Sequence, residues 1–146
     1  MCVGRLMQKI YETQSHLDDE AAIVAAICEW SDTDARKLPM KNRLDYVLYR
    51  GRKISSLLEV KRRHCDMRRY PDFMIAANKV MYARQLSEYF GLKCFLAVQW
   101  DDALGLVNMK QHKRIWLNGR KDRGDADDIE LQAYFDIDDF QIIRGS

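Results

Sequence analysis

Two carboxylates and one ammonium stand at strand-like positions where apolar side chains would be expected. Asp45 lies within the strand-forming run Arg43–Tyr49, and Glu59-Val60-Lys61 closes a second run that contains Leu57 and Leu58. Charged groups are rarely tolerated at such positions unless they are paired or hold a metal ion. Carboxylate oxygens suit Mg²⁺, and bound Mg²⁺ can activate a water molecule and neutralise charge on a phosphate.

The segment around these residues predicts a β-hairpin. Residues 43–49 and 54–61 favour strands, and Arg50-Gly51-Arg52-Lys53 supplies the turn. A three-residue loop at 51–53 would set Asp45 opposite Glu59, whereas a two-residue Gly51-Arg52 turn would set it opposite Leu58 and send the carboxylates to opposite faces. A shared site therefore requires the longer loop, a bulge or divergence of the strands.

The order Asp45, then Glu59-Val60-Lys61, resembles the PD-(D/E)XK nuclease superfamily, which has the restriction-endonuclease-like fold, although Leu44 rather than proline precedes Asp45. The resemblance implies that Asp45 and Glu59 bind Mg²⁺, with Mn²⁺ as a substitute. It also implies that Val60 lends a backbone carbonyl, that Lys61 assists the attacking water, and that cleavage leaves a 5′-phosphate and a 3′-hydroxyl. The alternative for the same side chains is an exposed salt bridge on an edge strand.

A helix is predicted over residues 72–90, because Pro71 stands at its start and Gly91 just past its end. Gln85 and Tyr89 lie one turn apart on it. A Gln-x-x-x-Tyr pair in this place is similar to RecB-type nucleases, which implies that both side chains face the active site and orient water or contact the DNA backbone. Otherwise Gln85 is a solvated helix residue and Tyr89 a core aromatic.

An earlier helix is predicted over residues 18–29, whose Ala, Ile and Val content suits packing on a sheet. The same family places an acidic residue on such a helix beside the metal. Glu20 is the candidate, and Glu12 and Glu29 are alternatives. Acidic residues at a helix start also favour its dipole, so Glu20 has a purely structural interpretation as well.

Charge is unevenly distributed along the chain. Residues 36–69 carry twelve Lys and Arg against three acids, a net of +9, whereas residues 122–139 have a net of −7. This split favours a basic surface for phosphates around the hairpin, with the acidic segment turned away or against a protein partner. The candidate phosphate contacts are Arg50, Arg52, Lys53, Arg62, Arg63, Arg68 and Arg69.

The predicted fold is α/β: a mixed central β-sheet flanked by helices, with a restriction-endonuclease-like core at about 18–109 and a β-rich C-terminal extension at 110–144. Residues 1–146 are expected to form a single nuclease-like domain. Strands are predicted at 93–100, 103–109, 113–118 and 130–137. Apolar runs are too short for a membrane span and the start lacks a signal-peptide core, so a cytoplasmic location is expected.

These features predict a Mg²⁺-dependent deoxyribonuclease with DNA as its partner. The alternative is a nucleic-acid-binding or regulatory module that keeps the fold without the chemistry. Homo-oligomerisation or a protein partner stays open, because no residue pattern decides it.

Overall fold

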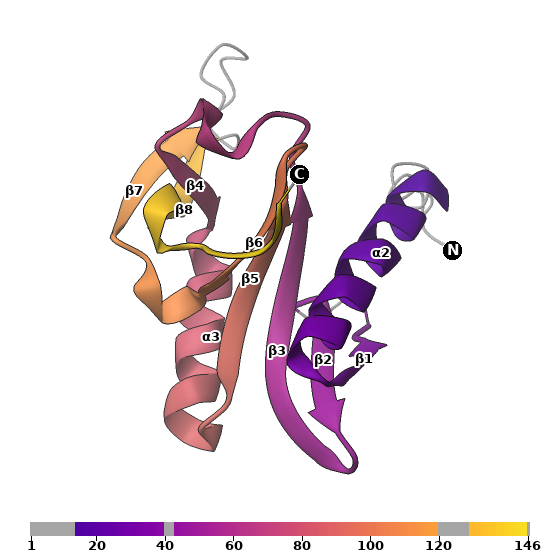
Figure 1. The fold of residues 1–146 in the computed structure, drawn as a ribbon. Helices are drawn as coiled ribbons and strands as arrows, with labels where there is room; N and C mark the ends of the chain where they lie inside the picture. Colours follow the sequence, from indigo (N-terminus) through magenta and orange to yellow (C-terminus); the bar gives the residue numbers. More distant parts are fainter. Residues whose placement is uncertain (1–13, 40–42, 120–128, 146) are drawn as a thin grey trace, which may run out of the picture.

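The computed structural model describes residues 14–39, 43–119 and 129–145, which form a mixed α/β fold (Figure 1). The helices are α2 (Gln14–Ser31) and α3 (Ala77–Phe90), with short 3₁₀ turns η1 (Met67–Arg69), η2 (Met109–Gln111) and η5 (Ile137–Asp139). The strands are β1 (Asp34–Lys37), β2 (Tyr46–Arg50), β3 (Lys53–Arg62), β4 (Asp72–Ala76), β5 (Lys93–Gln99), β6 (Ala103–Asn108), β7 (Arg114–Gly119), β8 (Ile129–Asp136) and β9 (Gln141–Gly145).

The strands in the described ranges form two sheets. Six of them make the larger sheet, in the order β1-β2-β3-β5-β6-β9, and the smaller sheet has the order β4-β8-β7. Only β3 and β5 pair in parallel, because β4 and α3 lie in the crossover between them; the other neighbours are antiparallel. The predicted strands at 93–100, 103–109, 113–118 and 130–137 are therefore confirmed within a residue or two at each end.

The larger sheet separates two apolar layers. Helix α2 covers one face, and α3 with the smaller sheet covers the other (Figure 1). Leu58 and Val60 of β3 belong to the α2 layer, whereas Leu57 belongs to the α3 layer. Because side chains alternate along a strand, Glu59 and Lys61 share the face of Leu57 and point toward the α3 layer.

The hairpin between β2 and β3 combines a two-residue turn with a β-bulge. Arg50 pairs with Lys53 across Gly51-Arg52, and Gly51 has the left-handed φ of 64° that such a turn favours. The register then shifts by one residue, so that Ser55 is the extra residue of β3, and Tyr46 pairs with Leu58. One position further along, Asp45 lies opposite Glu59. The register required for a shared site is thus reached through the bulge, not through a longer loop.

The predicted helix over residues 72–90 is wrong in its first five residues. Asp72–Ala76 form strand β4, paired with β8, and α3 begins at Ala77. Phe73 and Ile75 alternate with Met74 and are buried in the α3 layer, so a strand buries this stretch better than a helical turn would. The end of the helix is confirmed: Gly91 has a φ of 66°, and its N–H donates to the Ser87 carbonyl at 3.0 Å.

The C-terminal strands join both sheets. Strand β9 pairs with β6 at the edge of the larger sheet, and β8 pairs with β4 in the smaller one. Phe135 of β8 and Phe140 after η5 are buried in the α3 layer together with Phe73 and Trp100. The predicted C-terminal extension at 110–144 therefore contributes Phe135 and Phe140 to the α3 layer.

Candidate active site

Asp45 is held at the end of β2 by main-chain and side-chain hydrogen bonds to β3. Its N–H donates to the Leu58 carbonyl at 3.1 Å, and its Oδ2 accepts the N–H of Val60 at 2.9 Å. The carboxylate thus takes a place in the ladder that a main-chain carbonyl would otherwise fill. It is thereby fixed beside Glu59.

Glu59 is the most buried charged residue among those described, with 1% of its surface exposed. Burial, reinforced by the neighbouring Asp45 carboxylate, raises the pKa of Glu59 to about 8. The two carboxyl groups therefore lie side by side, an arrangement that the sequence left open because it depends on the register of the hairpin.

Lys79 completes this cluster, and the sequence analysis missed it. From the first turn of α3, its Nζ forms an ion pair with Glu59 Oε2 and donates to the Arg43 carbonyl at 2.8 Å. The ammonium opposes the rise in the pKa of Glu59. The predicted helix over residues 72–90 put Lys79 in its third turn, where a lysine is usually solvated, so the sequence carried no signal for it.

Lys61 and Val60 directly follow Glu59 on β3. Lys61 is partly exposed on the same strand face as Glu59, about 7 Å further along β3. Its ammonium forms no ion pair with any other described residue. The N–H and C=O of a strand residue point to the same side, so the Val60 carbonyl faces the side from which Asp45 approaches.

The donor set suits a hard divalent cation. Glu59 Oε2 forms the ion pair with Lys79. No described residue donates a hydrogen bond of normal geometry to this oxygen. Mg²⁺ is commonly held by one or two carboxylates and keeps several waters. No cluster of three or more His, Cys, Asp or Glu side chains suited to a metal occurs in the described ranges. Asp45, Glu59 and the Val60 carbonyl are the oxygen donors that could hold such a cation here.

Three predicted residues are not brought to this cluster. Gln85 and Tyr89 lie roughly 9 and 15 Å beyond Lys79 along α3, and both are exposed, Tyr89 to 78%. Glu20 belongs to α2, on the opposite face of the sheet, where it pairs with Lys37 at 3.0 Å. Burial, with a smaller contribution from the Glu20 carboxylate, raises the pKa of Tyr46 to about 12. The alternative Glu29 is exposed on α2, and Glu12 lies outside the described residues.

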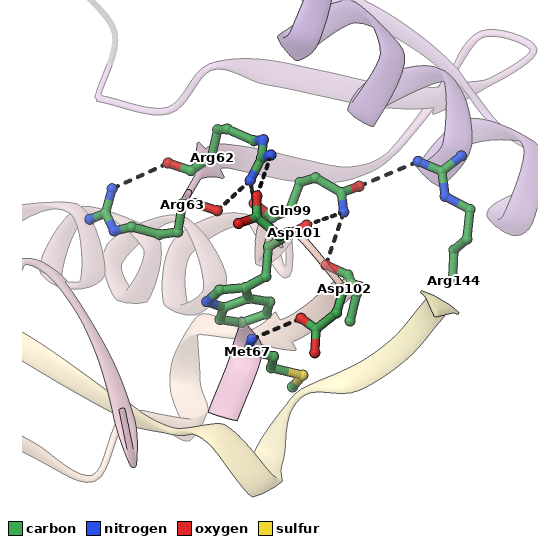
Figure 2. Close-up of polar contacts among 9 residues, drawn as sticks. Arg62, Arg63, Met67, Gln99, Asp101, Asp102 and Arg144 are labelled. Carbon is green, nitrogen blue, oxygen red and sulfur yellow. Dashed lines mark hydrogen bonds and ion pairs between the residues drawn. The ribbon is translucent and has the colours of Figure 1, made fainter. Parts of the chain in front are cut away.

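Three of the seven candidate phosphate contacts are already bound to carboxylates or main-chain carbonyls of the protein. Arg50 donates to the Ser31 and Asp32 carbonyls at the end of α2, and Arg68 pairs with Asp138 at 2.8 Å. Arg62 binds Asp101 at 2.8 Å and the Gln99 carbonyl at 3.1 Å (Figure 2).

The other candidates form no ion pair with a described residue. Arg63 lies over the Phe73 ring and Arg69 over the Tyr70 ring, while Arg52 and Lys53 are exposed at the hairpin tip. Asp138 and Asp139 of the acidic segment meet Arg68 and Lys113, so part of that segment contacts the basic part of the same chain.

Comparisons with known proteins agree with this architecture. The family model described as "Phage putative PDDEXK endonuclease" matches residues 6–143. Comparison with curated protein sequences finds no match. Among solved structures, Hjc, a Holliday junction resolvase from the archaeal hyperthermophile Archaeoglobus fulgidus, superposes with a TM-score of 0.55 at 14% identity, over 82% of this chain and 87% of that one. This likeness confirms the predicted restriction-endonuclease-like fold. None of the described helices is long and apolar enough to cross a membrane.

Proposed function

The chain belongs to the family of phage putative PDDEXK endonucleases, and we propose that it is a metal-dependent deoxyribonuclease that uses Mg²⁺ or Mn²⁺. The observation that carries this proposal is the coupled Asp45–Glu59 pair. Two neighbouring carboxylates, one of them buried and with its pKa raised to about 8, cost folding free energy. A divalent cation between them would neutralise both charges, so the arrangement is explained by a ligand rather than by stability.

Each group of the cluster has a role in the proposed reaction. Asp45, Glu59 and the Val60 carbonyl would hold the metal ion, which when bound supplies charge neutralisation at the phosphate and a more acidic water. Lys61, on the same face and without an ion pair to any described residue, would orient the attacking water. Such cleavage is expected to leave a 5′-phosphate and a 3′-hydroxyl.

Lys79 is a positioning residue in this scheme. It holds the Glu59 carboxylate from the helix side, and its bond to the Arg43 carbonyl ties α3 to the segment that leads into Asp45. The three elements that carry the site are therefore fixed to one another before a metal ion arrives. Fixing ligands in advance is what gives a site its geometry.

Cleavage of labelled oligonucleotides with Mg²⁺ or Mn²⁺ tests the assignment, using single-stranded, duplex and branched DNA. We expect Glu59→Ala and Lys61→Ala to reduce cleavage at least 100-fold. The matched controls are Glu88→Ala and Lys93→Ala, an exposed acid and an exposed base away from the cluster. Thermal melting should also show stabilisation by Mn²⁺ in the wild type and not in Glu59→Ala.

Retention of full cleavage by Glu59→Ala or Lys61→Ala would overturn the assignment. Salt-sensitive DNA binding without cleavage and without stabilisation by metal would identify a nucleic-acid-binding module instead.

A further inference from the structure

A cavity of about 300 Å³ lies between the segment that leaves β3 and strand β8. Its walls include four aromatic side chains, one guanidinium and one carboxylate: Tyr70, Phe73, Trp100, Tyr134, Arg63 and Asp72. None of these groups belongs to the metal cluster.

Arg63 connects the cavity to the proposed active site. Its N–H donates to the Gln99 carbonyl at 2.9 Å, so the pairing of β3 with β5 continues past Arg62. Arg63 therefore points to the same face as Glu59 and Lys61, roughly 7 Å beyond Lys61. A DNA strand with a phosphate at Glu59 would bring its next nucleotides over this cavity.

The walls favour a flat ligand with polar edges. The Arg63 guanidinium lies 4.7 Å from the centroid of the Phe73 ring, and Phe73 meets Trp100 edge to face at 5.9 Å. Tyr70 leaves 59% of its surface exposed at the mouth. Aromatic rings and guanidinium planes stack on nucleobases. Asp72 pairs with Arg114 at 3.7 Å through Oδ2, and its carboxylate keeps further lone pairs that accept from a base amino group. A phosphate would gain nothing from the aromatic walls.

The loop that forms the mouth is held in place without a ligand. The Met67 N–H donates to Asp102 Oδ1 at 2.8 Å (Figure 2), and the Asp101 N–H donates to the Cys65 carbonyl at 3.0 Å. Within η1, Arg68 pairs with Asp138. A pocket that is already ordered loses less entropy on binding.

We propose that this cavity receives one unstacked nucleobase of the substrate strand, one or two nucleotides from the scissile phosphate. The inference rests on the proposed nuclease function and names its substrate class. A base can enter only after it leaves the stack, and that costs least in single-stranded, frayed or branched DNA. The protein should therefore prefer such DNA over a continuous duplex.

The test uses oligonucleotides with the fluorescent adenine analogue 2-aminopurine at successive positions, bound to the Glu59→Gln variant so that no cleavage occurs. We expect an emission change at one position only, and loss of that change in Tyr70→Ala. Affinity for single-stranded DNA, measured by anisotropy, should fall about 5- to 100-fold in Tyr70→Ala, which corresponds to one stacked base.

Two matched variants separate stacking from charge. Arg63→Lys keeps the charge but loses the planar guanidinium, so the emission change should disappear while the salt dependence of binding is kept. Phe90→Ala removes a ring that is 71% exposed at the far end of α3, and it should alter neither signal.

Equal emission at all positions, or wild-type affinity and emission in Tyr70→Ala, would overturn the proposal. Normal emission in Arg63→Lys would limit Arg63 to a charge contact and overturn its stacking role. The nuclease proposal can fail separately from the base pocket. A position-specific signal without metal-dependent cleavage by the wild type would support the base pocket and refute the nuclease. Cleavage without such a signal would support the nuclease and refute the base pocket.

Discussion

The ammonium of Lys79 lies against the buried carboxylate of Glu59, joining the first turn of α3 to the centre of β3. Glu59 is 1% exposed, so solvent screens this pair far less than a surface salt bridge. The helix and the larger sheet are therefore coupled through the same carboxylate that we assign to the metal.

Substitution of Lys79 by methionine should destabilise the protein in a pH-dependent way. The change leaves Glu59 buried without its cation, and we expect the free energy of unfolding to fall by about 1–3 kcal/mol at pH 9 and by less at pH 6, where Glu59 takes up a proton. Urea denaturation of Lys79→Met, Glu59→Gln and the double variant gives the coupling energy. The exposed Arg84–Glu88 pair on α3 is the control, with an expected coupling below about 0.5 kcal/mol. Equal coupling in the two pairs would refute the buried interaction.

Stability without metal should decrease as the pH rises. The pKa of Glu59 is 4.5 when unperturbed and about 8 in the folded protein, so the folded state binds this proton more tightly. Its contribution is fully present below pH 4.5 and is lost as the pH passes 8, by an amount on the order of 1–4 kcal/mol. Comparison of wild type and Glu59→Gln by urea denaturation with EDTA, between pH 5 and 9, should show this loss in the wild type alone. Parallel pH profiles of the two proteins would show that Glu59 does not titrate in this range.

Arg50 and Arg52 should behave differently although they are two residues apart. Arg50 caps the end of α2 through the Ser31 and Asp32 carbonyls, so Arg50→Ala should lower the free energy of unfolding by about 1 kcal/mol. Arg52 is exposed at the hairpin tip, so Arg52→Ala should leave stability within about 0.5 kcal/mol. If the tip touches DNA, Arg52→Ala should also reduce the salt dependence of binding by roughly one phosphate contact. A stability loss in Arg52→Ala alone would contradict this division.

Deletion of one serine from Ser55-Ser56 should be tolerated. Ser55 is the unpaired residue of the bulge, and its removal leaves a regular two-residue hairpin in which Asp45 still lies opposite Glu59. Cleavage is expected to stay within a few-fold of the wild type. Insertion of a further serine at the same place is the control, because it requires a second rearrangement of the hairpin. Loss of stabilisation by Mn²⁺ in the deletion variant would show that the bulge itself shapes the site.

The sequence identified the Asp45–Glu59 pair because alternation along a strand is local and the two carboxylates contradict an apolar pattern. It left the register open, since a bulge is decided by the packing of both faces and not by the turn alone. The assignments of Gln85 and Tyr89 came from motif resemblance, and both residues lie on an exposed side of α3.

The misassigned strand and the missed lysine have a related cause. Asp72–Ala76 follows a proline that suits a helix start, and its pairing with β8, far along the chain, leaves no signal in the local sequence. Shortening the helix to Ala77 places Lys79 in its first turn and turns that side chain toward Glu59. An error in one long-range pairing therefore concealed a residue of the site.

The pairing of β4 with β8 also constrains the order of folding. Ile75 is matched with Ala133, so a ribosome that has synthesised Asp45, Glu59, Lys61 and Lys79 has made every group of the cluster but not the strand that supports the start of α3. Contacts so distant in sequence form late and slowly. A nascent or truncated chain would carry the residues of a nuclease without its rigid site, and it would expose the open edge of β4 to aggregation. Cleavage competence should thus appear only as synthesis nears the end of this domain.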